Sequence, residues 1–159
     1  TIDFHGGEPM LAFDKIVEAI NYTEQLNRQE NLGKELYYSF QTNGTLLNRN
    51  NIKRLLELPN LRIGLSLDGP QEVQDKNRLF AGPDPKRGSF QKVVENFQLA
   101  REMGLYLGVL GVIHDPQDYL KSFKFFTETL IFRQFILQKI LQIRSVRQSG
   151  QRIMRRLLG

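Results

Sequence analysis

The 159-residue sequence contains no cysteine and no tryptophan. Without cysteine the chain can form neither a disulfide nor a thiolate metal site. Its two histidines, His5 and His114, are far apart in the sequence, which argues against a self-contained zinc site. No apolar run approaches the roughly 20 residues that a membrane-spanning helix needs. The absence of disulfides fits a cytoplasmic protein.

A secretory leader is also missing from the start of the sequence. Residues 1–5 have no basic stretch followed by an apolar core, and the first residue is threonine rather than methionine. The chain opens on an apolar alternation that passes directly into Gly6 and Gly7, as if in the middle of a strand. We therefore expect the source protein to have a further N-terminal part.

Acidic residues are missing from one end of the chain only. Residues 131–159 contain seven Lys or Arg and no Asp or Glu, whereas the first 130 residues carry 15 basic and 17 acidic side chains. The body is therefore not a nucleic-acid-binding surface by composition, and no nucleic-acid partner is expected for it. We divide the chain into a core at 1–130 and a basic tail at 131–159.

The core alternates short strand patterns with helical patterns. Strands are predicted at 1–4, 36–40, 61–67 and 105–113, and helices begin near Phe13, Ile52, Ser89 and Pro116. Ser89 is the predicted N-cap of its helix, and Gly104 is placed to end it. A strand–helix alternation of this kind implies parallel strands, either in an open α/β sheet or in part of a (β/α) barrel.

Unusual residues follow three of the predicted strands. Because parallel strands place ligands at their carboxyl ends, these residues are candidate site residues. They lie in Gly6-Gly7-Glu8-Pro9, in Gln41-Thr42-Asn43-Gly44 and in Ser66-Leu67-Asp68-Gly69-Pro70.

The glycine pair is the corner with the clearest chemistry. Glycines let a ligand approach the backbone closely, and the carboxylate of Glu8 beside them suits a cationic amine. The phosphate-binding patterns G-x-x-x-x-G-K and G-x-G-x-x-G are both absent. Arg78 offers a planar fork that matches a carboxylate. Each feature also has a simpler interpretation, as a tight turn or a solvated side chain.

Taken in order, these residues resemble the radical S-adenosylmethionine superfamily, in particular the peptide- and protein-modifying maturases that include the anaerobic sulfatase-maturating enzymes. The resemblance is carried by residues 4–11, 40–47 and 64–70 with Asp75 and Arg78, and by 88–90 with Val93 and Asn96. It covers residues 1 to about 130 and implies an incomplete (β/α)6 barrel of the TIM type with parallel strands.

The resemblance also implies cofactors. Members of the family hold a [4Fe–4S] cluster on a C-x-x-x-C-x-x-C loop and reduce S-adenosylmethionine to a 5′-deoxyadenosyl radical. By position, Gly6, Gly7 and Glu8 would receive the amino group of its methionine portion. Ser66 and Arg78 would contact the same portion, with the arginine on its carboxylate, and Gln41 and Asn43 would line the mouth. The implied partner is a peptide or protein substrate such as a sulfatase.

This sequence departs from the family at both ends. The cluster loop is absent, no residue can be named as catalytic, and the isolated chain is expected to be inactive and poorly soluble. After about Thr129 a basic sequence stands where the family would continue with a fifth strand. Apolar residues at roughly helical intervals predict a basic amphipathic helix there, and an out-of-frame terminus is the simpler explanation of the lost acidic residues.

Two other functions remain open at this point. One is a non-enzymatic module whose basic tail binds anionic partners such as a membrane surface or DNA. The other is a different α/β enzyme that uses Glu8, Asp68 and His114 as acid–base groups.

Overall fold

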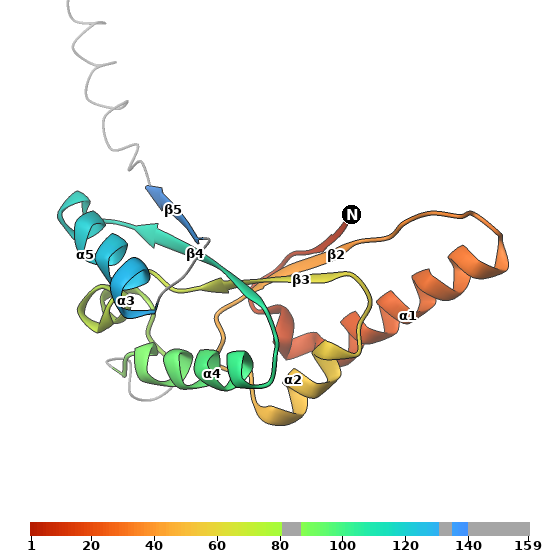
Figure 1. Cartoon of the computed structure of the whole chain (residues 1–159), viewed down its shortest axis with the longest axis horizontal. Coiled ribbons are helices and arrows are strands. Elements are labelled where there is room, and N and C mark those ends of the chain that lie inside the picture. Colours follow the sequence, from red (N-terminus) through yellow and green to blue (C-terminus); the bar gives the residue numbers. More distant parts are fainter. Residues whose placement is uncertain (81–86, 131–134, 140–159) are drawn as a thin grey trace, which may run out of the picture.

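The computed structural model describes residues 1–80, 87–130 and 135–139 (Figure 1). Within them lie the strands β1 (Ile2–Phe4), β2 (Tyr38–Thr42), β3 (Leu61–Ser66), β4 (Leu107–Ile113) and β5 (Phe135–Lys139). The helices are α1 (Phe13–Gln29), α2 (Arg49–Leu56), α3 (Gln71–Asn77), α4 (Phe90–Glu102) and α5 (Tyr119–Lys124). Shorter helical turns are η1 (Pro9–Ala12), η2 (Pro116–Asp118) and the π-helical η3 (Phe125–Thr129).

All five strands belong to one parallel sheet whose strand order follows the chain order, β1-β2-β3-β4-β5. Ile2 is opposite Tyr38, Tyr38 is opposite Leu61, and Ile63 is opposite Leu107. The parallel α/β architecture predicted from the sequence is therefore confirmed. The second strand begins and ends two residues later than predicted, so that Gln41 and Thr42 belong to the strand itself.

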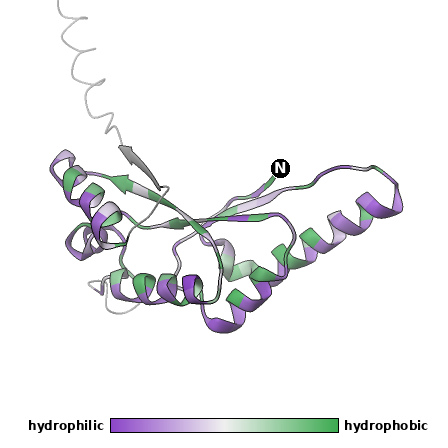
Figure 2. Ribbon diagram, in the orientation of Figure 1, coloured by the Kyte–Doolittle hydropathy of each residue, from purple (hydrophilic) through white to green (hydrophobic). Residues whose placement is uncertain are grey.

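One face of the sheet is covered by helices, and the core lies between them. Figure 1 shows α1, α2 and α4 on the same side of the strands, and Figure 2 shows their hydrophobic surfaces turned toward the sheet. Strand residues alternate in burial, as in β4 (Leu107–Ile113), because side chains of period two point to opposite faces. The core side chains include, from the strands and helices in turn, Tyr38, Phe40, Ile63, Leu65, Leu107, Val109, Phe13, Ile16, Ile20, Ile52, Leu55, Val93, Phe97 and Ala100.

The polar stretch after β3 is more regular than the sequence indicated. It contains the short helix α3, and Leu79 and Gly88 then pair as an isolated antiparallel bridge. Ser89 precedes α4 as expected, but its side chain makes no capping bond. The carboxylate of Asp75 instead accepts the N–H of Phe90 at 2.9 Å, and Gly88 leaves room for that carboxylate. Gly104 follows α4 with φ +83°, which confirms its predicted role at the helix end.

The prediction for the tail is wrong over the part that the structure describes. Residues Phe135–Lys139 form β5, which pairs in parallel with β4 from Val109 to Ile113. A fifth strand therefore stands at the position where the basic composition predicted a helix in place of one. The other predicted tail residues, 131–134 and 140–159, lie outside the described residues.

Candidate functional site at the carboxyl edge of the sheet

The sequence-predicted site residues all lie at or just beyond the carboxyl ends of the first three strands. Gly6, Gly7 and Glu8 follow β1, Gln41 and Asn43 lie at the end of β2, and Ser66 closes β3. Arg78 comes from the C-terminal end of α3, directly after that strand. Because the strands are parallel, these residues share one edge of the sheet.

The glycine pair forms an open corner. An added β-carbon at Gly6 or Gly7 would meet no atom within 4 Å, and Gly6 has a φ of +156°. Backbone atoms at this corner are therefore accessible to a ligand, as the sequence predicted.

The carboxylate of Glu8 joins the glycine corner to the end of β2. Its Oε1 accepts the N–H of Met10 at 3.0 Å and the hydroxyl of Thr42 at 2.7 Å. Its Oε2 accepts the N–H of Asn43 at 2.7 Å. An ionised carboxylate has about four acceptor positions, so these three bonds leave room for one more donor. Glu8 is thus both a structural tie and a possible ligand group.

Gln41 and Ser66 meet on the helix-free face of the sheet. The Nε2 of Gln41 donates to the Oγ of Ser66 at 3.1 Å. Opposite Gln41 in the register stands Gly64, which removes a side chain from the same face. Since the serine oxygen accepts this bond, its own hydrogen remains to be donated to an acceptor.

Asp68 and Arg78 form a partly buried ion pair. The Nε and Nη2 of Arg78 donate to the two carboxylate oxygens at 2.7 and 2.9 Å, while the Asp68 side chain is only 1% exposed. Asp68 Oδ1 also accepts the N–H of Val112 on β4 at 2.8 Å. The arginine fork that the sequence assigned to a ligand carboxylate is therefore held by a carboxylate of the protein.

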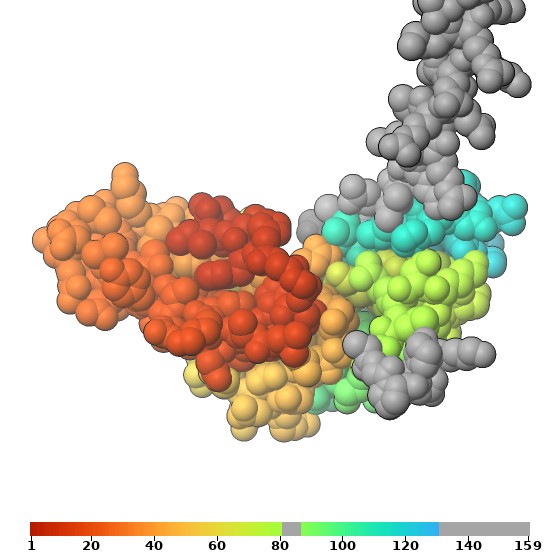
Figure 3. Space-filling view, turned by 180° about the vertical axis from the view of Figure 1, so that it is seen from behind, coloured from red at the N-terminus to blue at the C-terminus, as the bar shows by residue number. Residues whose placement is uncertain are grey.

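Three predicted residues line one pocket at this edge. Glu8, Asn43 and Arg78 do so together with Leu11, Leu46 and Phe80. Figure 3 shows the red N-terminal turn on one side and the yellow-green segment around α3 on the other, with orange residues between them. Gln41 instead lines a second hollow, on the open face, with Asp3, Ser39, Arg62 and Gly108. The structure thus brings the predicted residues to one edge but divides them between two adjoining hollows.

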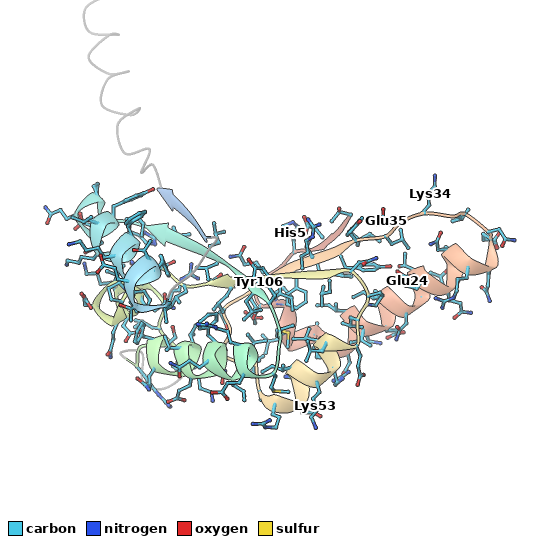
Figure 4. All side chains as sticks on the ribbon, viewed as in Figure 1. His5, Glu24, Lys34, Glu35, Lys53 and Tyr106 are labelled. Carbon is cyan, nitrogen blue, oxygen red and sulfur yellow. The ribbon has the colours of Figure 1, made fainter. Side chains whose placement is uncertain are left out.

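The acid–base alternative loses its central carboxylate. Both oxygens of Asp68 are occupied by Arg78 and Val112, and the side chain is buried. His114 is exposed. His5 is also exposed, with its Nε2 3.7 Å from Asp3 Oδ2, on the helix-free side of the sheet (Figure 4). No arrangement of these three groups for acid–base catalysis follows from the structure.

Thr42 is a site residue that the sequence did not single out. Its hydroxyl contacts Glu8, and it also accepts the N–H of Gly44 at 3.1 Å. The available signal was its place between Gln41 and Asn43, but a buried threonine at a strand end is ordinarily a packing residue.

Neither a metal cluster nor a membrane span emerges from the described part of the chain. It contains no group of three or more His, Asp or Glu side chains placed to hold a metal ion. Within the same residues, no helix combines the length and the apolar character needed to cross a bilayer.

A parallel α/β sheet with helices on one face and a polar, glycine-bearing carboxyl edge defines a ligand-binding partial barrel. The model of the radical SAM superfamily matches residues 1–126 of the sequence. The chain belongs to this superfamily, as the resemblance of its motifs indicated.

Curated relatives extend this finding to a branch of the family. The chain is 36% identical over 140 residues to a cysteine-type anaerobic sulfatase-maturating enzyme of Clostridium novyi, covering 86% of this chain and 36% of that protein. It is 31% identical over 130 residues to a serine-type enzyme of Bacteroides thetaiotaomicron, covering 76% of this chain and 29% of that one. The chain therefore spans about a third of the length of these relatives.

Solved structures agree with the relatives. The sulfatase-maturating enzyme anSMEcpe with bound AdoMet superposes with a TM-score of 0.73 at 30% identity, over 87% of this chain and 35% of that one. The same enzyme with AdoMet and the Kp18Cys peptide gives a TM-score of 0.73, also at 30% identity, over 88% of this chain and 37% of that one.

Proposed function

We propose that this chain is the S-adenosylmethionine-binding part of a radical SAM enzyme that modifies a peptide or protein, as the sulfatase-maturating enzymes do. The observation that carries the proposal is the shared edge of the sheet, where an open glycine corner, a carboxylate with a spare acceptor position and a serine hydroxyl lie at successive strand ends. Family membership and the relatives that bind AdoMet support the same ligand.

The residues present fit the methionine portion of S-adenosylmethionine. The bare backbone at Gly6 and Gly7, with Glu8, offers acceptors for its ammonium group. Ser66 has a hydroxyl hydrogen for its carboxylate, and Gln41 orients that hydroxyl through the 3.1 Å bond. Asn43 lines the pocket beside Glu8. When bound and reduced, this cofactor supplies a 5′-deoxyadenosyl radical; the protein residues bind it and orient it.

Arg78 has a different contribution in this proposal from the one its motif suggested. Two of its five N–H groups are used by Asp68. Its contact with the cofactor would come from the remaining donors at the pocket wall, while the ion pair fixes the loop that follows β3.

The iron–sulfur cluster does not fit the residues of this chain. Its usual ligands are cysteine thiolates, and the 159 residues contain none. We therefore derive no step through the cluster. In the proposed enzyme its ligands belong to another part of the protein, and so do the groups that recognise the peptide substrate.

Titration calorimetry of the 159-residue chain with S-adenosylmethionine tests the proposal. We expect saturable binding that weakens about fivefold to tenfold in Ser66→Ala, since one hydrogen bond to a charged group is lost. Ser39→Ala is the matched control, because Ser39 lies on the same strand and face as Gln41 but closer to the amino end. Absence of binding by the unaltered chain, or equal losses in both variants, would refute the proposal.

Reconstitution with iron and sulfide gives a second test. The chain should show no [4Fe–4S] absorbance, because no thiolates are present. A cluster at full occupancy would contradict this.

A second candidate function rests on the charge distribution alone. Residues 131–159 carry seven basic and no acidic side chains, which suits an anionic partner. A salt-sensitive affinity for anionic vesicles or DNA that disappears on deletion of residues 140–159 would favour it.

A further inference from the structure

Thr42 stands at the junction of two loops at the edge of the sheet. Its side chain is only 1% exposed, at the last position of β2. Its hydroxyl donates to Glu8 Oε1 at 2.7 Å and accepts the N–H of Gly44 at 3.1 Å. One hydroxyl therefore connects the turn after β1 to the turn after β2.

The turn after β2 is itself fixed from the helix side. Asn96 of α4 is 4% exposed and donates from Nδ2 to the carbonyl oxygens of Gly44 and Thr45 at 2.8 and 3.0 Å. Gly44 has φ +77°, and a β-carbon there would come within 2.5 Å of the Leu65 side chain. With this turn fixed to the core, the Thr42 hydroxyl gives Glu8 a rigid partner.

Glu8 in turn sets the position of the glycine corner. Its carboxylate follows Gly7 directly in the sequence, and its side chain also accepts the N–H of Met10 in η1. All three donors that the structure shows on this carboxylate are uncharged. The orientation of the carboxylate, and with it the position still open to a further donor, depends on the hydroxyl of Thr42 and the N–H of Asn43.

We propose that Thr42 is a positioning residue for S-adenosylmethionine: its buried hydroxyl holds the Glu8 carboxylate and the glycine corner in the geometry that receives the ammonium group of the ligand. This inference rests on the proposed function. It assigns the affinity for the amino-acid end of the ligand to a residue that does not itself line the pocket.

Paired substitutions separate the hydroxyl from the shape of the side chain. Thr42→Val keeps the branched shape and removes the hydroxyl, whereas Thr42→Ser keeps the hydroxyl. By calorimetry we expect the affinity for S-adenosylmethionine to fall about tenfold in Thr42→Val and to stay within about twofold of the unaltered chain in Thr42→Ser. Thr127→Val is the matched control, because the Thr127 hydroxyl donates to the carbonyl of Phe123 on exposed helix.

A second ligand shows where the loss arises. 5′-Methylthioadenosine lacks the amino-acid end, so its affinity should be the same in Thr42→Val and Thr42→Ser. Equal losses for both ligands would indicate a general loss of structure and would overturn the inference. If 5′-methylthioadenosine binds too weakly to measure, the valine and serine pair decides alone.

The remaining outcomes are also decisive. Circular dichroism and thermal unfolding establish that each variant is folded, and Thr42→Ala replaces Thr42→Val if the latter is not. Unchanged binding in the variant without the hydroxyl would refute the role of Thr42 and leave the proposed function intact. No binding by the unaltered chain would refute both.

Discussion

At the carboxyl edge of the sheet, Glu8 and Asp68 solve a similar problem with different partners. Each follows a strand, each accepts three hydrogen bonds, and each ties its loop to the next strand of the sheet: Glu8 to β2 through Thr42 and Asn43, and Asp68 to β4 through Val112. The donors on Glu8 are uncharged, whereas Asp68 is paired with the guanidinium of Arg78. Asp68 already has its cation, and Glu8 is the carboxylate that can take one from a ligand.

The largest expected effect comes from breaking the Asp68 side of this comparison. Asp68→Asn removes the charge that balances a partly buried guanidinium, so we expect the free energy of unfolding to fall by about 3 kcal/mol. Urea denaturation measures the loss. Asp14→Asn is the control, because the pair of Asp14 with Arg54 is exposed and should contribute less than about 1 kcal/mol. Similar losses in the two variants would show that Asp68 is not a buried structural ion pair.

A third carboxylate, Glu24 on α1, extends the comparison to the opposite end of β2. It accepts the hydroxyl of Tyr38 at 3.0 Å, and burial together with this bond raises the pKa of Tyr38 to about 12. A raised pKa in the folded state means that the stabilisation is complete below pH 10 and is lost as the pH rises toward 12. The free energy of unfolding should fall by about 2 to 3 kcal/mol over this interval.

The difference between the unaltered chain and Tyr38→Phe isolates this term from the other groups that titrate in alkali. Chemical denaturation at several pH values between 9 and 12 provides the measurement. A difference that stays constant with pH would show that Tyr38 titrates normally.

Glu8→Gln should have a smaller effect on stability than Asp68→Asn. The amide keeps an oxygen for Thr42 and Met10 but turns its NH₂ toward the N–H of Asn43, which places two donors together. We expect a loss of about 1 to 2 kcal/mol by urea denaturation. Glu18→Gln, on the exposed face of α1, is the control. A loss as large as that of Asp68→Asn would mean that Glu8 also balances a cation of the protein.

The smallest effect is expected at Asp118, where the cations are on the surface. Asp118 is buried, but its partners Lys76 and Lys121 are about half exposed. The hydrogen bond from Lys76 lowers the pKa of Asp118. This stabilisation is therefore present above the ordinary pKa of an aspartate and is lost as the pH falls below it. Lys76→Gln should move the pKa of Asp118 upward in an NMR titration, whereas Lys121→Gln, whose contact is 3.3 Å, should move it less.

The sequence predicted the edge of the sheet well because strand–helix alternation and glycine turns are local signals. Gly6, Gln41 and Ser66 needed only their strand ends to be placed correctly, and parallel pairing then brought them together. Their contacts were harder to predict. That Arg78 meets Asp68 depends on how α3 folds back after β3, and a polar loop gives no such indication.

The tail shows a different limit of sequence analysis. Charge segregation was weighted above local pattern at residues 135–137, where Phe, Ile and Leu follow one another and favour a strand. The backbone of this segment completes the hydrogen bonds of β4, which composition cannot indicate. Similarly, the N-terminal N–H of α4 is capped by Asp75, 15 residues away, rather than by the adjacent Ser89.

The agreement between strand order and chain order has a consequence for biosynthesis. Every strand pairs only with the strands immediately before and after it in the chain, so each newly made strand finds its partner already present. Loop closure for each pairing spans only one helical connection, which keeps the entropic cost of every step modest. Such a sheet can be assembled progressively as it leaves the ribosome, without waiting for distant segments.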